Sequence, residues 1–345
     1  MKKVWLIIPA ALLIAYLLGP QIPPPSEGID LPEISSDLHE LESIINDAED
    51  TVAGLKPDNR ARIIWYDSVR RTPYVFVYLH GWSASYREGD PLHKELAHRY
   101  GANLYLPRLY GHGIDTGDNN FADLTADKLI RSAKEAIAVS THLGDSVIII
   151  GTSTGGTLGL YLANSSPSIS SLILYSPNVR IFDKSSVILD DPWGIQIGEL
   201  VTGSPYYEWQ AEGPRKQYWT TRYRLESLGQ LQALVEYTMR PEVFHGIKKP
   251  VFTGCFYKDD AVQDHTVSVD AIVEMYDQLG SSSKELVKFP NVGHHVIASS
   301  LTSEDLASVR NETTKFLEEI IGLKPVINPQ AAGAMKNDGM APIQF

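Results

Sequence analysis

The sequence predicts an α/β protein with a mostly parallel sheet that is covered by helices on both faces. Seven short runs of β-branched, aliphatic and aromatic residues recur along the chain, and several are apolar throughout, as parallel strands buried on both faces are. Segments with the apolar spacing of helices separate these runs. The 345 residues, 43% of them hydrophobic, are enough to bury one large core.

Strand and helix signals alternate in chain order, which is the pattern of a wound sheet. The strand runs are 63–66, 74–79, 102–106, 147–150, 172–175, 251–256 and 286–289, and the helical segments are 36–55, 91–100, 125–143, 157–165, 268–279 and 303–321. We see no internal repeat, so we expect one domain over residues 34–323. The last segment, 324–345, loses periodicity and gathers Gly, Asn and Pro, which predicts a flexible tail.

The N-terminal segment differs from the rest of the chain. Lys2 and Lys3 precede an apolar stretch from Val4 to Leu18, so residues 1–20 are predicted to be a signal anchor or a signal peptide. Residues 21–33 (QIPPPSEGIDLPE) predict a stiff, Pro-rich linker. The positive charges and the lack of a small-x-small cleavage site favour an uncleaved membrane anchor with the domain on the non-cytoplasmic side. An exported protein is the alternative.

Composition excludes some functions. The 42 acidic residues outnumber the 30 Lys and Arg, which argues against nucleic acid as a partner. The single cysteine, Cys255, cannot form an internal disulfide, and it lies in an apolar run that predicts burial. No spaced set of His and Cys suggests a zinc site, so we expect no metal.

A candidate nucleophile follows the fourth strand run. There the chain continues as Gly151-Thr152-Ser153-Thr154-Gly155 and then enters a helical segment. A turn this tight needs small residues on both sides, because the serine takes a strained backbone conformation. The G-x-S-x-G pattern between a strand and a helix therefore predicts that Ser153 is a nucleophile exposed at the carboxyl edge of the sheet.

Two later loops offer a base and a carboxylate. A serine nucleophile needs a general base, and that base needs an orienting acid. The loop after the sixth strand run contains Asp259, Asp260 and Asp264, and the loop after the seventh contains His294 and His295. The order Ser, Asp, His is the one that G-x-S-x-G hydrolases use. The residues alone leave the choice within each loop open.

Three motifs in the correct order carry a resemblance to a known family. They are residues 78–82 (YLHGW), 107–113 (PRLYGHG) and the serine turn 151–155 (GTSTG). Over about 61–323 the chain resembles the carboxylesterase, monoacylglycerol-lipase and serine-aminopeptidase-like branch of the α/β-hydrolase superfamily. The resemblance implies the α/β-hydrolase fold, with a cap inserted at about 178–246.

The resemblance also implies roles for individual residues. The backbone N–H groups of Trp82 and Thr154 would form the oxyanion hole, while His80 would have a structural role in its loop. Asp264 is favoured as the acid, since a valine and a helix follow it at the usual distance, and Asp260 and Asp259 remain alternatives. His295 is favoured over His294 as the base, because a Val-Ile pair follows it as in some esterase relatives.

The cap sequence predicts an apolar pocket. It holds more aromatic residues than a solvated loop needs, namely Trp193, Tyr206, Tyr207, Trp209, Tyr218, Trp219, Tyr223 and Tyr237. Most of them should pack the core of the cap, and together they suggest a site for an acyl chain.

We therefore expect a serine hydrolase that cleaves a small-molecule or lipid-like carboxylic ester through an acyl-enzyme, without cofactor or metal. A peptidase with the same triad is one alternative, and acidic cap residues that could bind a substrate amine would favour it: Asp190, Asp191, Glu199, Glu208 and Glu212. A catalytically silent binding protein held at a membrane is the other.

Overall fold

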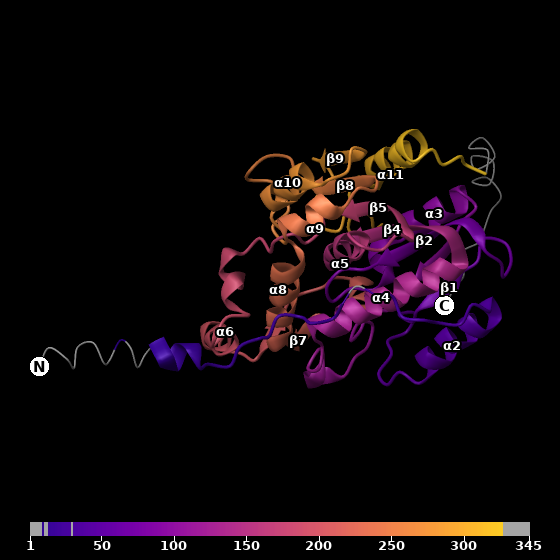
Figure 1. Ribbon diagram of the computed structural model, residues 1–345. Coiled ribbons are helices and arrows are strands. Elements are labelled where there is room, and N and C mark those ends of the chain that lie inside the picture. The colour runs from indigo at the N-terminus through magenta and orange to yellow at the C-terminus, as the bar shows by residue number, and fades with distance from the viewer. Residues whose placement is uncertain (1–8, 10–12, 29, 327–345) are drawn as a thin grey trace, which may run out of the picture.

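The computed structural model describes residues 9, 13–28 and 30–326, and its centre is a seven-stranded sheet (Figure 1). The strand order is β1-β3-β2-β4-β5-β8-β9, and only β1 runs antiparallel to its neighbour. The strands are β1 (Arg62–Ile64), β2 (Thr72–Leu79), β3 (Asn103–Leu106), β4 (Gly144–Thr152), β5 (Ile169–Tyr175), β8 (Val251–Phe256) and β9 (Lys284–Phe289). The predicted mostly parallel α/β sheet is confirmed.

Helices cover both faces of the sheet. They are α2 (Leu38–Asp50), α3 (Leu92–Arg99), α4 (Ala126–Leu143), α5 (Thr154–Ala163), α10 (Val269–Gln278) and α11 (Leu306–Lys315), which continues into a π-helical turn, η4 (Phe316–Ile320). Alternate residues of a strand point to opposite faces. Accordingly Val75 and Val77 of β2 join the core under α4, α5 and α10, whereas Phe76 and Tyr78 join the core under α3 and α11.

Two helix boundaries differ from the sequence prediction. The helix expected to reach residue 55 ends at Asp50 with Thr51 as its C-cap, and the chain then turns at Gly54, which has a φ of 73° and whose carbonyl accepts a hydrogen bond from Asp115 N. The helix expected from residue 157 already begins at Thr154. The second difference matters for the site, since it places the N-terminus of α5 directly after Ser153.

The chain between β5 and β8 forms the cap. It contains η3 (Lys184–Ile188), α6 (Gly194–Thr202), β6 (Tyr206–Glu208), α7 (Arg215–Tyr218), β7 (Arg222–Arg224), α8 (Glu226–Thr238) and α9 (Pro241–Gly246). β6 and β7 pair as an antiparallel ribbon, and α8 packs against α4 and α5. α6 lies farther out, at the end of the molecule where the N-terminal segment projects (Figure 1).

The predicted Pro-rich linker contacts the domain. The backbone N–H groups of Ser26 and Glu27 both donate to Asp127 Oδ1 at 2.7 Å, and the Glu27 carboxylate pairs with Lys134 at 2.7 Å. These contacts hold the linker along α4. Before it, Trp193 of the cap donates through Nε1 to the carbonyl of Ala15 at 3.0 Å.

The predicted anchor falls only in part on the described residues, which include a short helical stretch at 13–17. Within the described ranges, no helix has the length and apolar character needed to cross a bilayer. The predicted tail, 324–345, lies outside them apart from its first three residues.

Candidate active site

The serine turn has the strained geometry that its glycines predict. Ser153 joins β4 to α5 with φ 52° and ψ −118°, a conformation that costs a non-glycine residue roughly 1–3 kcal/mol. A Cβ on Gly151 would lie 2.7 Å from the carbonyl oxygen of Gly155. A Cβ on Gly155 would collide with the carbonyl of Leu79 in β2. Only glycine at both positions lets the turn pack this closely against the sheet.

Asp264 and His295 form a hydrogen-bonded pair at the carboxyl edge of the sheet. Asp264 Oδ2 lies 2.5 Å from His295 Nδ1. The other carboxylate oxygen, Oδ1, accepts hydrogen bonds from the backbone N–H groups of Thr266 at 2.8 Å and Val267 at 3.2 Å. These bonds fix the carboxylate, and the carboxylate in turn fixes which ring nitrogen of His295 carries the proton.

The pair also sets the charges of its members. Burial opposes ionisation of Asp264, but the charge and hydrogen bond of His295, with the two backbone donors, hold its pKa below the usual value. Burial likewise opposes protonation of His295, and Asp264 outweighs it, so that the pKa of His295 is raised. His295 is thus a stronger base than an ordinary buried histidine.

The alternative residues have other partners. His294 Nδ1 accepts a hydrogen bond from Val296 N at 2.9 Å, and burial, followed by the charges of His295 and Arg215, lowers the pKa of His294 to about 4. Asp260 accepts from the hydroxyl of Tyr257 at 2.7 Å in an exposed turn. Asp259, in the same turn, accepts from backbone N–H groups.

Ser153 and His295 converge on the end of β5. The carbonyl of Tyr175 accepts a hydrogen bond from Ser153 N at 3.0 Å, and the hydroxyl of the next residue, Ser176, donates to the carbonyl of His295 at 2.8 Å. His295 Nε2 is buried and has no hydrogen-bond partner among the described residues. The imidazole therefore has Nδ1 occupied by Asp264, whereas Nε2 has no partner among the described residues.

The two backbone amides expected in an oxyanion hole lie on adjacent segments. Trp82 follows the end of β2, and Thr154 is the first residue of α5. Neither N–H donates a hydrogen bond to another residue in the described part of the chain. His80 braces the first segment: its Nε2 accepts from Leu109 N at 3.1 Å and its Nδ1 lies 3.0 Å from the carbonyl of Gly81. Burial lowers the pKa of His80 to about 4, so this brace is neutral.

Glu88 is a buried carboxyl group at the site that the sequence did not reveal. It is 2% exposed, and its Oε2 accepts a hydrogen bond from Gly81 N at 2.5 Å. It lies in the polar stretch SYREGD (85–90), whose sequence gives no sign that this glutamate is buried and not a solvated loop residue. Its burial depends on contacts with β2 and with the serine turn.

Cap aromatics cover the catalytic loops. Trp219 is buried against Ala84 and Val296, the latter being the residue after His295. The Trp82 ring packs edge-on against Tyr223 of β7, with ring centroids 6.1 Å apart. Two of the eight cap aromatics, Trp219 and Tyr223, thus pack over the loops, whereas Trp193 and Tyr207 are exposed.

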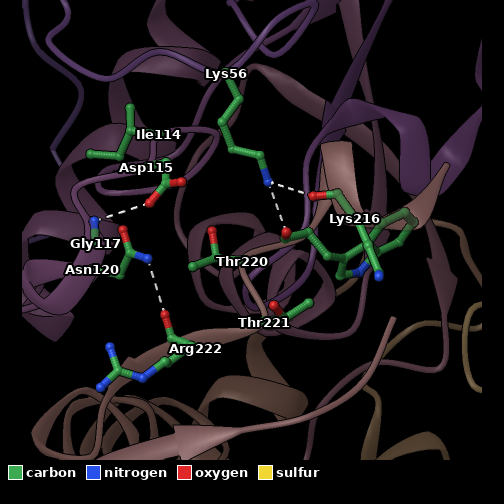
Figure 2. A pocket seen from close by; sticks show the side chains of 10 residues that line it. Lys56, Ile114, Asp115, Gly117, Asn120, Lys216, Thr220, Thr221 and Arg222 are labelled. Carbon is green, nitrogen blue, oxygen red and sulfur yellow. Dashed lines mark hydrogen bonds between the residues drawn. The ribbon is translucent and has the colours of Figure 1, made fainter. Parts of the chain in front are cut away.

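The cavity in Figure 2, of about 250 Å³, lies between the cap and the loops before β1 and around residues 114–120, and none of its lining residues is a candidate catalytic residue. Its lining is mostly polar, with Lys56 Nζ donating to the carbonyls of Lys216 at 3.0 Å and Trp219 at 2.8 Å (Figure 2). The apolar acyl pocket expected from the cap aromatics stays a prediction.

The acidic cap residues differ in their surroundings: Asp190 and Glu199 are half-buried, and burial raises the pKa of Asp190 to about 6. Glu208 is paired with Arg222, and Asp191 and Glu212 are exposed. Among the described residues, no cluster of three or more His, Cys, Asp or Glu could hold a metal ion.

A strained serine beside a hydrogen-bonded Asp–His pair, at the carboxyl edge of a parallel sheet, is the arrangement of an α/β-hydrolase. The chain belongs to the alpha/beta hydrolase family, whose model matches residues 76–308. No curated protein sequence matches it.

Solved structures show the same fold. A structure of the metagenome-derived lipolytic enzymes LipS and LipT is 18% identical, with a TM-score of 0.61, and the alignment covers 77% of this chain and 99% of that one. A soluble variant of the Saccharomyces cerevisiae monoglyceride lipase is 14% identical, with a TM-score of 0.58 and coverages of 75% and 91%. A putative non-heme bromoperoxidase, BpoC, from Mycobacterium tuberculosis is 13% identical, with a TM-score of 0.54 and coverages of 78% and 98%. These structural similarities establish the fold, and at identities this low they do not establish the reaction.

Proposed function

We propose that this chain is a serine hydrolase of carboxylic esters, with Ser153 as nucleophile, His295 as general base and Asp264 as the acid that orients it. The observation that carries the proposal is the 2.5 Å contact between Asp264 and His295 beside a serine held at φ 52°. Lipolytic enzymes and a monoglyceride lipase share the fold, which supports an ester as the substrate.

The proposed reaction has two steps. Ser153 Oγ attacks the ester carbonyl while His295 Nε2 takes its proton, and Asp264 stabilises the imidazolium that forms. The negative oxygen of the tetrahedral intermediate accepts hydrogen bonds from the backbone of Trp82 and Thr154, each worth about 3 kcal/mol in the transition state. His295 then protonates the leaving alcohol. Water, activated by the same imidazole, releases the acid and restores Ser153.

The direct test is labelling with a fluorophosphonate, which reacts covalently with an activated serine. We expect the wild-type chain to be labelled and to hydrolyse short p-nitrophenyl esters, and Ser153→Ala to lose both activities. Thr157→Ser, in the helix after the turn, is a control that keeps Ser153. An unlabelled, inactive wild type would mean a silent binding protein, and labelling of folded Ser153→Ala would place the nucleophile elsewhere. Faster cleavage of aminoacyl amides than of esters would favour the peptidase alternative.

We propose further that the N-terminal segment holds the enzyme at a membrane, with the catalytic domain on the non-cytoplasmic side. The support is the apolar sequence from Val4 to Leu18 behind two lysines. On the same end of the molecule α6 exposes Leu200 and Val201 to 84% and 80%. Fractionation tests this: the full chain should remain with membranes after a high-salt wash. A soluble mature protein beginning near Gln21 would mean export instead.

A further inference from the structure

We propose that Glu88 is a positioning residue, which ties together the two segments that supply the oxyanion-hole amides and places a second carboxylate close to Ser153. The inference rests on the proposed function and assigns a role within that same site. Glu88 lies in the short 3-10 helix η1 (Tyr86–Gly89), which follows the oxyanion segment.

A chain of hydrogen bonds connects Glu88 to both segments. Its Oε2 accepts from Gly81 N, the amide just before Trp82, at 2.5 Å, and lies 3.2 Å from the hydroxyl of Tyr78. That hydroxyl is also 2.9 Å from Thr152 Oγ1, in the residue before Ser153. Tyr78 and Thr152 are fully buried, so these polar groups have no water to replace the contacts. Glu88 thus links the turn after β2 to the turn after β4.

The carboxyl group also lies close to the nucleophile. A Cβ built on Gly81 would lie 2.8 Å from Glu88 Oε1 and 3.0 Å from the Cβ of Ser153. The carboxyl group and the serine therefore stand on either side of one empty Cβ position. Any shift of Glu88 would move Gly81, and with it the neighbouring amide of Trp82.

Charge gives Glu88 a second effect. Burial raises the pKa of Glu88 to about 7, against the opposing effects of the Gly81 amide, His295 and Tyr78. The charge of Glu88 in turn raises the pKa of His295, after the larger contribution of Asp264. Other titratable groups around the pair are His294, which is neutral, and His93 of α3, whose ring packs on Tyr78. Arg87, next in the chain, is paired with Asp90.

Two substitutions separate the two effects. Glu88→Gln keeps an acceptor for Gly81 N but removes the negative charge. In wild type that charge favours the imidazolium of His295 and disfavours the oxyanion. Since these effects oppose each other, kcat should stay within about tenfold of wild type. Glu88→Ala leaves Gly81 N–H and the Tyr78 hydroxyl without this partner, so kcat should fall about 100-fold with KM nearly unchanged. Glu95→Gln, which removes an exposed carboxylate from α3, is the matched control.

The deciding measurement needs no substrate. We expect NMR titration of the His295 ring to show its pKa lower in Glu88→Gln than in wild type, by about half a pH unit or more. Glu95→Gln should leave it unchanged. The acidic limb of kcat/KM in Glu88→Gln should move to lower pH with it. Because the titration reports on charge near His295 in any case, it distinguishes a wrong role for Glu88 from a wrong reaction for the enzyme.

The results that would overturn the proposal are equally specific. An unchanged His295 pKa in Glu88→Gln would remove the electrostatic role. Activity of Glu88→Ala that equals wild type per serine labelled by fluorophosphonate would reduce Glu88 to a structural residue. If Glu88→Ala does not fold, Glu88→Asp replaces it, because the shorter side chain keeps the charge but cannot reach Gly81 N without a shift, and kcat should fall at least tenfold. Wild-type kcat in Glu88→Asp would contradict the positioning role.

Discussion

The loops around Ser153 are buried and hydrogen-bonded, whereas the outer side of the cap is exposed and apolar. At the loops, Ser153 is 6% and Asp264 1% exposed, and backbone and side-chain hydrogen bonds fix each group. On the outer side of the cap, Leu200 and Val201 of α6 are mostly exposed, and no polar contact restrains their side chains. In the first region, the Ser153 backbone and the Asp264 carboxylate find their hydrogen-bond partners within this chain. The second region leaves apolar side chains exposed.

α6 shows how the second region arises. One face of the helix is packed: Ile195 is buried, and a Cβ on Gly198 would touch Leu225. The opposite face carries Ile197, Leu200 and Val201, which share one side of a helix because they are three and four residues apart. A helix that is apolar on both faces is expected to be covered on both. The candidate site is therefore held in place by contacts within this chain, whereas the outer face of α6 suits an apolar environment.

The largest expected effect comes from removing the proposed general base. His295→Ala should lower kcat by at least 10⁴-fold, while His294→Ala should lower it by less than tenfold, because only His295 is paired with Asp264. In wild type, kcat/KM should fall as the pH drops through the raised pKa of His295, since only the neutral ring accepts the serine proton. Steady-state kinetics on a soluble ester checks the ratio. The reverse ranking of the two variants would assign the base to His294.

The next effect concerns the acid. Asp264→Asn should lower kcat by about 10³- to 10⁴-fold, because the amide no longer stabilises the imidazolium and favours the wrong tautomer of His295. Asp260→Asn removes a carboxylate from the same loop but only disturbs an exposed bond to Tyr257, so its kcat should remain within about twofold. Equal losses in the two variants would contradict the assignment of Asp264.

The sequence predicted those parts of the site that depend on local rules. All seven strands of the sheet fall on apolar runs, and the glycines around Ser153 identify the strained turn because only glycine fits there. Spacing alone left Asp264 and Asp260, and likewise His295 and His294, as open choices. Which member of each pair faces the other depends on how two loops far apart in sequence meet, and that is a tertiary property.

Other features lay beyond the sequence for the same reason. Glu88 is a polar residue in a polar stretch, and only the fold buries it beside Gly81 and Tyr78 of β2. The stiff, Pro-rich linker was predicted from composition, but its contacts were not, since the partners of Glu27, Arg131 and Lys134, come from a helix about a hundred residues later.

A smaller effect should follow from loosening the cap over the site. Lys56→Met removes the two hydrogen bonds that an ammonium ion donates to the carbonyls of Lys216 and Trp219 (Figure 2). The free energy of unfolding should fall by about 1–3 kcal/mol. Activity should fall several-fold, because Trp219 packs on the residue after His295. Lys216→Met, at the exposed wall of the same cavity, is the control, and chemical denaturation with parallel kinetics checks both. A stability of Lys56→Met equal to that of the control would show that this link does not hold the cap.

The smallest effect on the folded enzyme should come from the outer face of α6. The double substitution Leu200→Ser with Val201→Ser removes only exposed apolar surface, so the free energy of unfolding should change by less than about 0.5 kcal/mol. Hydrolysis of a soluble acetate ester should be unchanged, since these residues have no part in the catalytic loops. Hydrolysis of a long-chain ester presented in lipid vesicles should fall at least tenfold if the surface contacts lipid, because burying one such side chain fully contributes about 1.5–3 kcal/mol and about 1.4 kcal/mol is a factor of ten. Ile44→Ser, at an equally apolar exposed position on α2, should leave the ratio of the two rates unaltered. A ratio that stays constant in the α6 variant, or falls as far in Ile44→Ser, would mean that the exposed face has no lipid partner.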